Sequence, residues 1–200
     1  MTVTVIDYKA GNLTSVVKAL RHLGADVEVT DTPGPLDNAT RIILPGVGHF
    51  AATKRLDDTG LTDATRGAIA RGIPFLGICV GMQWLYAAST EAPDQPGLGY
   101  FSETLERFPD GDQKVPHVGW NQLNPKPTSR LLQGVADSEF AYFTHAWRAP
   151  ITAVTAATTD YIQPFASAVE QDNVFGVQFH PEKSSETGLK ILRNFLELAQ

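Results

Sequence analysis

The apolar residues in the first half of the chain follow two alternating periods. Short runs rich in valine and isoleucine predict strands at residues 2–7, 25–30, 41–45 and 73–79. Apolar residues three or four apart predict helices at residues 13–23, 61–71 and 81–88, with Asn12 as the N-cap of the first and with Gly24 and Gly72 as stops. Strands alternating with helices are typical of βαβ units, which place helices on both faces of a parallel sheet.

The second half of the chain is organised differently. Turn-rich stretches at 94–99 and 121–129 flank short apolar runs such as 100–105, a pattern that favours antiparallel strands. The irregular stretch from 108 to 121 predicts either a functional loop or a wrong assignment. A strand at 173–179 and a helix beginning at Ser185 or Thr187 end the pattern. We expect an α/β fold of three layers, with an open mixed sheet, mostly parallel, flanked by helices in a single domain over residues 1–200.

Composition narrows the class of protein. The chain has 200 residues, of which 42% are hydrophobic and 19% charged, as in ordinary globular domains. It carries 16 basic and 22 acidic residues, and its net charge of −6 lacks the basic footprint of a nucleic-acid-binding protein. The single cysteine, Cys79, cannot form an intramolecular disulfide, which suits a reducing compartment.

The sequence predicts neither secretion nor a membrane span. Residues 1–7 lack a basic n-region and reach Asp7 too early for a secretory signal. The uncharged stretch at 73–90 is interrupted by Pro74 and Gly77 and falls short of the roughly 20 apolar residues that a span needs. We therefore interpret it as a buried strand followed by a buried helix, and we expect a cytoplasmic protein.

Cys79 is the first candidate for chemistry. A lone cysteine is most often a small buried apolar residue, but this one stands in a Gly-Ile-Cys-Val-Gly sequence between a predicted strand and a predicted helix. Such spacing is typical of a nucleophile elbow, whose flanking glycines allow a turn so tight that the central side chain stands clear of the sheet. The N–H groups that open the helix, beginning with Val80, would favour a thiolate and a developing oxyanion.

A thiolate nucleophile needs a base, and His180 is the best placed of the five histidines. It directly follows the predicted strand at 173–179, and Glu182 stands two residues further on. In this arrangement Glu182 can hold the imidazole tautomer while His180 takes the proton of Cys79. Two other interpretations stay open, a capped turn before the last helix and a pair of metal ligands. No third ligand is evident, so we predict no metal.

The turn at 46–48 is the third element. Its glycines let backbone N–H groups approach a ligand, so Val47 and Gly48 can supply the second half of an oxyanion hole opposite Val80. A plain tight turn is the commoner meaning of two glycines at this spacing. The motif is not a dinucleotide-binding fingerprint, because Ala51 replaces the third glycine, and we predict no cofactor.

These motifs resemble those of the class I glutamine amidotransferases that use a catalytic triad. The resemblance is carried by Pro-Gly-Val-Gly at 45–48, Gly-Ile-Cys-Val-Gly-Met-Gln at 77–83 and Phe-His-Pro-Glu at 179–182. More narrowly, the segments at 7–13, 114–121 and 180–184 are similar to those of glutaminase subunits of imidazole glycerol phosphate synthase. The resemblance covers nearly the whole chain and implies a flavodoxin-like fold.

The resemblance implies a mechanism. Cys79 would attack the side-chain amide of glutamine, His180 would protonate the departing ammonia, and Glu182 would orient the histidine. The residues implied in binding glutamine are Gly46, Gln83, Thr144, His145 and Ala146. The chain departs from the family pattern at Ala146 and Trp147, where a small hydroxyl residue and then usually tyrosine are expected, and this leaves backbone groups to make the contacts there.

The resemblance also implies a partner, a (β/α)₈-barrel cyclase subunit that receives the ammonia. The partner would make imidazole glycerol phosphate and an aminoimidazole carboxamide ribotide in histidine biosynthesis. The residues implied to face or border it are Asn12, His117, Trp120, Asn121, Tyr142 and Lys183. Taken singly, each could belong to the core or to a solvated surface. As a group they are typical of an interface with an aromatic anchor.

Three alternatives stay open at this point. The glutaminase subunit of pyridoxal phosphate synthase shares the cysteine, the His-x-Glu pair and the length, but the Pro-His-Val-Gly-Trp-Asn segment at 116–121 argues against it. A catalytically silent binding module would keep the elbow for packing alone. A stand-alone cysteine hydrolase would be fully active without a partner. Within the site, His49 is a rival partner for Cys79.

Overall fold

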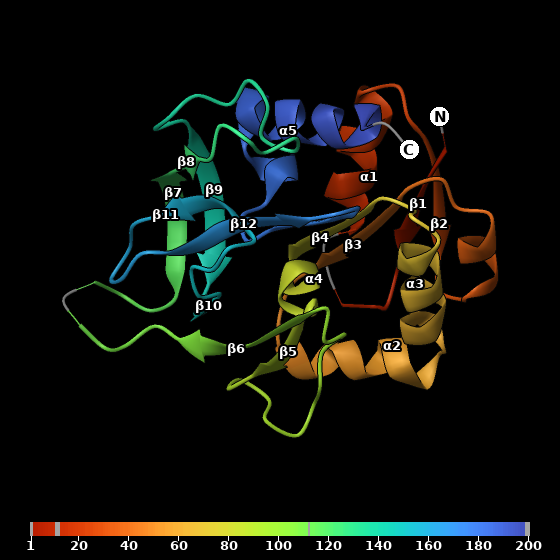
Figure 1. Cartoon of the computed structure of the whole chain (residues 1–200), viewed down its shortest axis with the longest axis horizontal. Coiled ribbons are helices and arrows are strands. Elements are labelled where there is room, and N and C mark those ends of the chain that lie inside the picture. The colour runs from red at the N-terminus through yellow and green to blue at the C-terminus, as the bar shows by residue number, and fades with distance from the viewer. Residues whose placement is uncertain (1, 11–12, 112, 199–200) are drawn as a thin grey trace.

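Residues 2–10, 13–111 and 113–198 are described by the computed structural model, and over these residues the chain forms an eight-stranded sheet (Figure 1). In spatial order its strands are β2 (Asp26–Thr30), β1 (Thr2–Ile6), β3 (Ile42–Gly46), β4 (Phe75–Cys79), β13 (Val174–Val177), β12 (Phe165–Gln171), β11 (Thr155–Thr159) and β8 (Asn124–Pro125). The strands from β2 to β13 run parallel, and β12, β11 and β8 follow as antiparallel neighbours. This confirms the expected mixed, mostly parallel sheet.

Helices cover both faces of the sheet (Figure 1). One face carries α1 (Leu13–His22) and α5 (Ser185–Glu197), and the other carries α2 (Lys54–Asp58) and α3 (Leu61–Ala70). Apolar residues at helical spacing place Val16 and Leu20 of α1 in the same core as Leu192 of α5. The three-layer architecture is therefore confirmed. Asn12, the expected N-cap of α1, lies outside the described residues.

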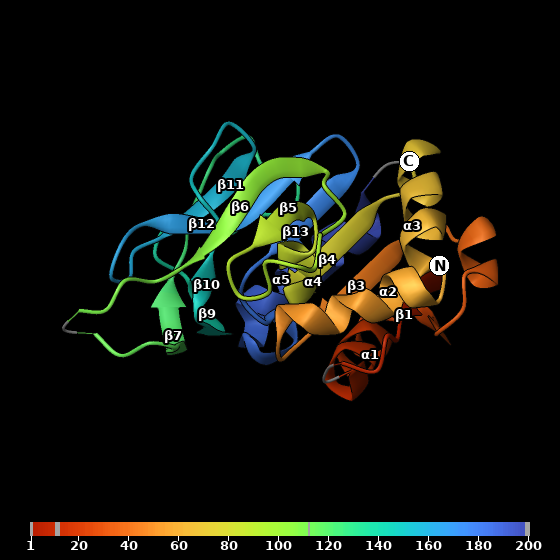
Figure 2. The ribbon, with the colours of Figure 1, turned by 90° about the horizontal axis from the view of Figure 1, so that it is seen from below.

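Two smaller sheets and three short helices complete the fold. One sheet contains β10 (Trp147–Arg148), β6 (Phe101–Arg107) and β5 (Tyr86–Ser89), and the other pairs β7 (His117–Gln122) with β9 (Phe140–His145). The 3₁₀ helices are η1 (Gly34–Asp37), η2 (Phe50–Thr53) and η3 (Pro181–Lys183). Figure 2 shows β7 and β9 at the end of the molecule remote from α3. The antiparallel additions expected in the second half are therefore present.

The helix predicted at 81–88 is wrong for most of its length. The observed helix α4 (Val80–Gln83) is a single turn, and strand β5 begins at Tyr86. Trp84 and Tyr86 are fully buried, and the Leu98 N–H donates a 2.6 Å hydrogen bond to the Trp84 carbonyl. Tertiary packing here outweighs the helical spacing of the apolar residues.

Among the described residues, no helix has the length and apolar character needed to cross a membrane.

The stretch from 108 to 121, predicted to be irregular, ends in strand. Residues from His117 onward form β7, which pairs with β9 along its whole length. Gly119 has a φ of +134°, a value that side-chain-bearing residues rarely adopt.

The carboxyl ends of the parallel strands meet at one edge of the main sheet. Gly46, the last residue of β3, is paired in register with Cys79, the last residue of β4. On the other side of β4, Val177 of β13 is paired with Ile78. Open α/β sheets bind ligands outside such an edge. The residues that follow these strands are therefore brought together there.

Candidate active site

Cys79 lies at a tight turn between β4 and α4. Its φ is +54°, a backbone value that a residue with a side chain adopts only where its surroundings enforce it. The flanking glycines allow the turn, because a β-carbon at Gly81 would overlap the Leu44 carbonyl and one at Gly77 would lie 2.6 Å from the Met82 nitrogen. The predicted elbow is present. Because α4 is a single turn, its dipole is weaker than the sequence suggested, and individual donors around the sulfur matter more.

The sulfur of Cys79 is enclosed, with the residue only 3% exposed. Gln178 Nε2 donates toward Sγ across 3.7 Å, and the carbonyl oxygen of Thr144 lies 4.0 Å from Sγ. An N–H donor so placed can form a hydrogen bond to the sulfur of the proposed nucleophile. The site therefore holds a donor for the nucleophile that the elbow motif did not indicate.

His180 and Glu182 form a buried pair beside Cys79. His180 Nδ1 lies 2.8 Å from Glu182 Oε1, and the two side chains are 1% and 2% exposed. Burial by itself lowers the pKa of His180, but hydrogen bonding and charge interaction with Cys79 and with the Glu182 carboxylate outweigh burial and raise the pKa to about 9. The Nε2 atom makes no hydrogen bond with any described residue, so it is free to exchange a proton with the sulfur or a bound substrate.

The triad is assembled by two adjacent strands. Because β4 and β13 are parallel neighbours, the residues that follow them, Cys79 and His180, emerge on the same edge of the sheet. The His180 N–H also donates a 2.9 Å hydrogen bond to the Tyr142 carbonyl of β9, which fixes the histidine against the smaller sheet. The structure thus brings together all three residues that the sequence proposed as catalytic.

The turn at 46–48 is only partly arranged as an oxyanion hole. Gly46 lies beside Cys79, but the Val47 N–H donates a long 3.5 Å hydrogen bond to the Ala10 carbonyl. Gly48 has a φ of +97° and is exposed. Val80 is the first residue of α4, where N–H groups have no acceptor within the helix. One expected donor is therefore in place and another, Val47, is already bonded elsewhere.

Gln83 lies in a buried amide pair next to the nucleophile. Its Nε2 donates to the Trp147 carbonyl across 3.3 Å and to Gln178 Oε1 across 3.1 Å. Both N–H groups of the amide are therefore used, and Oε1 is left as an acceptor. An acceptor can bind an N–H donor of glutamine, the ligand implied for this position.

The end of β9 contributes backbone rather than side chains. The Thr144 carbonyl faces Cys79, and the Ala146 carbonyl accepts a hydrogen bond from the Phe108 N–H. The ring of His145 is buried, and its two nitrogens are occupied by His117 and by the Trp147 carbonyl. The His145 side chain therefore offers no free hydrogen-bonding group to a ligand.

His49 is not arranged as a partner for the nucleophile. It is exposed, and its Nδ1 accepts a hydrogen bond of 3.1 Å from the Ala51 N–H at the start of η2. The ring caps this short helix, so among the described contacts of Cys79 the histidine partner is His180.

Two residues of the site escaped the sequence reasoning. Gln178 is fully buried in an apolar segment, two positions before His180, and the period of two along an extended chain was the signal that both face the site. The Tyr8 hydroxyl is buried without a hydrogen-bond partner among the described residues, and a β-carbon at Gly46 would collide with it. Burial, together with the charge of Cys79, raises the pKa of Tyr8. Sequence offered no signal for Tyr8.

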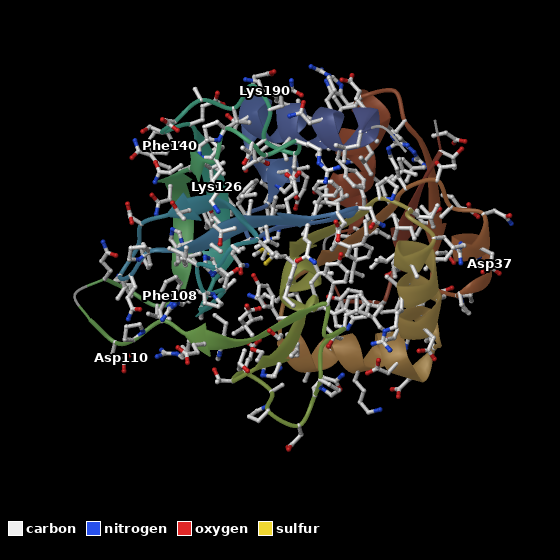
Figure 3. All side chains as sticks on the ribbon, viewed as in Figure 1. Asp37, Phe108, Asp110, Lys126, Phe140 and Lys190 are labelled. Atoms are coloured by element: carbon white, nitrogen blue, oxygen red, sulfur yellow. The ribbon has the colours of Figure 1, made fainter. Side chains whose placement is uncertain are left out.

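An exposed aromatic face lies beside the triad, on the outer side of β7 and β9. It consists of Val118, Trp120, Phe140 and Tyr142, with Trp120 51% exposed. The Trp120 and Tyr142 rings meet at 6.0 Å between centroids, and Lys183 Nζ lies 5.8 Å from the centre of the Tyr142 ring. Figure 3 shows Phe140 at the margin of the molecule. Trp120, Tyr142 and Lys183 are thus gathered on one surface.

The other residues expected at a partner surface are placed differently. His117 is only 3% exposed, so it does not face outward as a partner contact would, and that it borders a partner stays a prediction. Alternation along β7 turns it inward, where its ring stacks on Tyr161 and Phe143. Asn121 also directs its amide inward, to His117 and to the Asp160 carbonyl. Asn12 lies outside the described residues.

Comparison with known proteins adds independent findings. The family model described as glutamine amidotransferase class-I matches residues 4–199. The imidazole glycerol phosphate synthase subunit HisH of Methanothermobacter thermautotrophicus is 46% identical over 198 residues, which cover 98% of this chain and 98% of the relative. The protein of the same name from Moorella thermoacetica is also 46% identical, with 99% of this chain and 95% of the relative covered.

Solved structures share the fold at low sequence identity. A structure described as a glutamine amidotransferase superposes with a TM-score of 0.77 at 23% identity, covering 98% of this chain and 97% of the other. The structure of PurLQS from Thermotoga maritima gives a TM-score of 0.76 at 20% identity, with the same coverage. These similarities confirm the expected fold class.

Proposed function

The chain belongs to the class-I glutamine amidotransferase family, and from this premise we propose that it is the glutaminase subunit of an imidazole glycerol phosphate synthase. In this role it hydrolyses glutamine to glutamate and ammonia and passes the ammonia to a (β/α)₈-barrel cyclase subunit in histidine biosynthesis. Relatives that carry the name of this synthase subunit are 46% identical over nearly the full length. The observation that carries the proposal is the assembled set of Cys79, His180 and Glu182.

The proposed reaction follows from the geometry of the triad. The Cys79 thiolate forms a bond to the amide carbon of glutamine, and His180, protonated below pH 9, gives its proton to the nitrogen as the carbon–nitrogen bond breaks. Ammonia leaves and a thioester remains. The neutral His180 then takes a proton from water, the hydroxide displaces the sulfur, and glutamate is released. Glu182 holds Nδ1 so that Nε2 faces the reacting atoms.

The same chemistry supports a proposal for where the protein acts. Cys79 is the only cysteine of the chain and is free. A thiol nucleophile must stay reduced to act, and the cytoplasm keeps thiols reduced. This supports a cytoplasmic location for the proposed enzyme.

The oxyanion turn links activity to the partner. The Val47 N–H is bonded to the Ala10 carbonyl, so it cannot stabilise a tetrahedral oxyanion in this arrangement. We expect docking of the cyclase subunit to release this N–H toward Cys79. Loss of one oxyanion donor slows such reactions by about 10²- to 10³-fold, so the isolated chain should be a slow glutaminase.

The first test of the function is glutamate release from glutamine by the purified chain. It is measured alone, with the cyclase subunit, and with the cyclase subunit plus an analogue of its nucleotide substrate. We expect low activity alone and a rise of about 10²- to 10³-fold in the complex. High activity alone without stimulation would indicate a stand-alone hydrolase. No activity under any condition would indicate a silent module or a subunit of another synthase, such as pyridoxal phosphate synthase.

The aromatic face is the proposed docking surface for the cyclase subunit. The Tyr142 carbonyl accepts the His180 N–H, so a partner on this face lies close to the site where ammonia is formed. Exposed aromatic residues are the usual anchors of protein interfaces, and Lys183 adds a cation at the edge of the patch.

Trp120→Ala tests this surface. Removing the indole should weaken the affinity for the cyclase subunit by about 30-fold, the effect of losing an interface anchor. Titration of the cyclase subunit by calorimetry measures the change. Val29→Ala is the matched control, because Val29 is also an exposed apolar strand residue but lies on β2, an edge strand of the main sheet on the far side of the molecule from β7 and β9 (Figure 1). Equal affinities for Trp120→Ala and Val29→Ala would argue against docking on the aromatic face.

A further inference from the structure

Two buried histidines transfer no proton and form no bond in the proposed reaction. The rings of His117 and His145 touch each other, with His117 Nδ1 lying 3.1 Å from His145 Nε2. Aromatic rings enclose them, and the centroids of His117 and Tyr161 are 3.9 Å apart while those of His145 and Phe165 are 5.0 Å apart. Burial lowers the pKa of His117 to about 4 and that of His145 to about 3. Both rings are therefore neutral at pH 7.

The direction of the hydrogen bonds between these rings is determined by a backbone carbonyl. His145 Nδ1 lies 2.8 Å from the Trp147 oxygen, which can only accept, so Nδ1 carries the proton of the neutral ring. His145 Nε2 is then an acceptor, and His117 Nδ1 must donate to it. It follows that His117 Nε2 is also an acceptor.

The hydrogen bond at the other ring nitrogen of His117 has the same direction for an independent reason. Asn121 Oδ1 accepts a 2.8 Å hydrogen bond from the Gln122 N–H, and Asn121 Nδ2 donates to the Asp160 carbonyl across 2.9 Å. These two backbone partners orient the amide and leave the second N–H of Nδ2 to donate to His117 Nε2 across 3.2 Å. The Trp147 carbonyl at one end of this series and Asn121 at the other therefore require the same direction of donation.

The hydrogen bonds continue from these histidines to the nucleophile. The Trp147 carbonyl that accepts from His145 also accepts from Gln83 Nε2. Gln83 donates in turn to Gln178, whose Nε2 points at the Cys79 sulfur. An unbroken series of directed contacts thus joins the inner side of β7, behind the aromatic face, to the reacting atom.

We propose that His117 and His145 are positioning residues for the glutaminase reaction. Together with Asn121 and the Trp147 carbonyl they form a histidine chain, which holds that carbonyl and through it the Gln83 amide. With the chain intact, Gln83 directs Oε1 to the substrate and Gln178 directs an N–H to the sulfur. The inference rests on the proposed function, and it adds that β7, which carries part of the aromatic face on its outer side, is joined to the active site by hydrogen bonds from its inner side.

The protonation of the histidine chain can be observed directly by NMR of ¹⁵N-labelled histidine. Long-range correlations between ring nitrogens and carbon-bound protons distinguish the two neutral tautomers and the cation. We expect His117 and His145 to be neutral and protonated at Nδ1 at pH 7. A proton at Nε2 of either ring, or a charged ring, would contradict the derived polarity and overturn the proposal. This measurement does not depend on activity.

The kinetic test uses two substitutions of His145 in the complete complex. His145→Phe keeps a ring in the aromatic cluster but removes both hydrogen bonds, whereas His145→Asn keeps a donor near the position of Nδ1. We expect His145→Phe to lower kcat/KM for glutamine roughly 2- to 30-fold, the range for residues that act through others. His145→Asn should recover part of that loss. Synthesis from ammonium salt should be unaffected in both.

A matched control separates positioning from packing. Tyr161 stacks on His117 and donates a 2.6 Å hydrogen bond to the Lys114 carbonyl, which is not part of the histidine chain. Tyr161→Phe keeps the stacking, so it should lower the melting temperature without changing kcat/KM. If His145→Phe fails to fold, Asn121→Asp is used in its place. A carboxylate oxygen at the Nδ2 position would face the lone pair of His117 Nε2 and repel it. We therefore expect Asn121→Asp to lower kcat/KM for glutamine, as His145→Phe would.

Failure of this proposal and failure of the proposed function are distinguishable. A wild-type complex without glutaminase activity would reject the proposed function and with it any role of the histidine chain in that reaction. An active wild-type complex with unchanged kcat/KM in His145→Phe and Asn121→Asp would reject the histidine chain alone.

Discussion

Replacing Cys79 with alanine should abolish glutamine-dependent synthesis by the complex while synthesis from added ammonium salt continues. The substitution removes the sulfur that forms the thioester in the proposed reaction. Loss of a covalent nucleophile lowers kcat by about 10⁴- to 10⁶-fold. Steady-state assays of the reconstituted complex with glutamine and with ammonium salt measure the two activities.

Cys79→Ala should leave the fold intact, which makes the result interpretable. Alanine keeps the β-carbon, so the strained backbone at φ +54° meets the same steric conditions as with cysteine. The melting temperature and the affinity for the cyclase subunit serve as controls. If ammonium-dependent synthesis disappeared as well, the proposed division of labour between the two subunits would be wrong.

Glu182→Gln should lower kcat for glutamine hydrolysis on the order of 10³- to 10⁴-fold, the scale for the third member of a triad. The carboxylate holds His180 Nδ1 at 2.8 Å and favours the charged imidazolium that the reaction requires. A neutral amide of the same shape keeps the packing but can present an N–H to Nδ1, which would reverse the tautomer.

The same substitution should change the pH profile in a defined direction. The Glu182 carboxylate is one of the groups that raise the pKa of His180 to about 9, so wild-type kcat/KM should fall as the pH rises through that value and the proton donor is lost. In Glu182→Gln one of these influences is gone, so the basic limb should move to lower pH. An unchanged basic limb would mean that another group titrates there.

Glu186→Gln is the matched control for this experiment. It removes the same charge from an exposed position in the first turn of α5, four residues beyond Glu182. We expect its kcat and its pH profile to match those of the wild type. Similar effects of the two substitutions would show that net charge, rather than contact with His180, controls the reaction.

The triad could be predicted from the sequence because its determinants are local. Gly77 and Gly81 flank Cys79 at the spacing that the turn requires, and their close contacts with neighbouring backbone explain why larger residues do not fit. His180 and Glu182 are separated by a single residue, so their mutual geometry depends on a short segment. The alternation of strands and helices in the first half predicts a parallel sheet with Cys79 at its carboxyl edge, whereas the structure shows that β4 and β13 are neighbours.

The conformation of residues 81–88 and the burial of single residues on β7 depended instead on contacts between segments distant in sequence. The apolar spacing at 81–88 fits a helix, but burial of Trp84 and Tyr86 against the following loop makes most of the segment extended. His117 and Trp120 stand three residues apart on β7, yet one is buried and the other exposed, because a strand alternates its sides. That alternation became useful only once the strand itself was located.

The sequence by itself determined the fold class and the proposed nucleophile with its histidine and carboxylate, since periodicity and short motifs express local sterics and hydrogen bonding. Only the tertiary structure decided the direction of single groups: the Val47 N–H turned to the Ala10 carbonyl, and the Gln178 amide turned to Cys79. A peptide plane or an amide rotates at little local cost, so its orientation is set by partners distant in sequence, which no local pattern records.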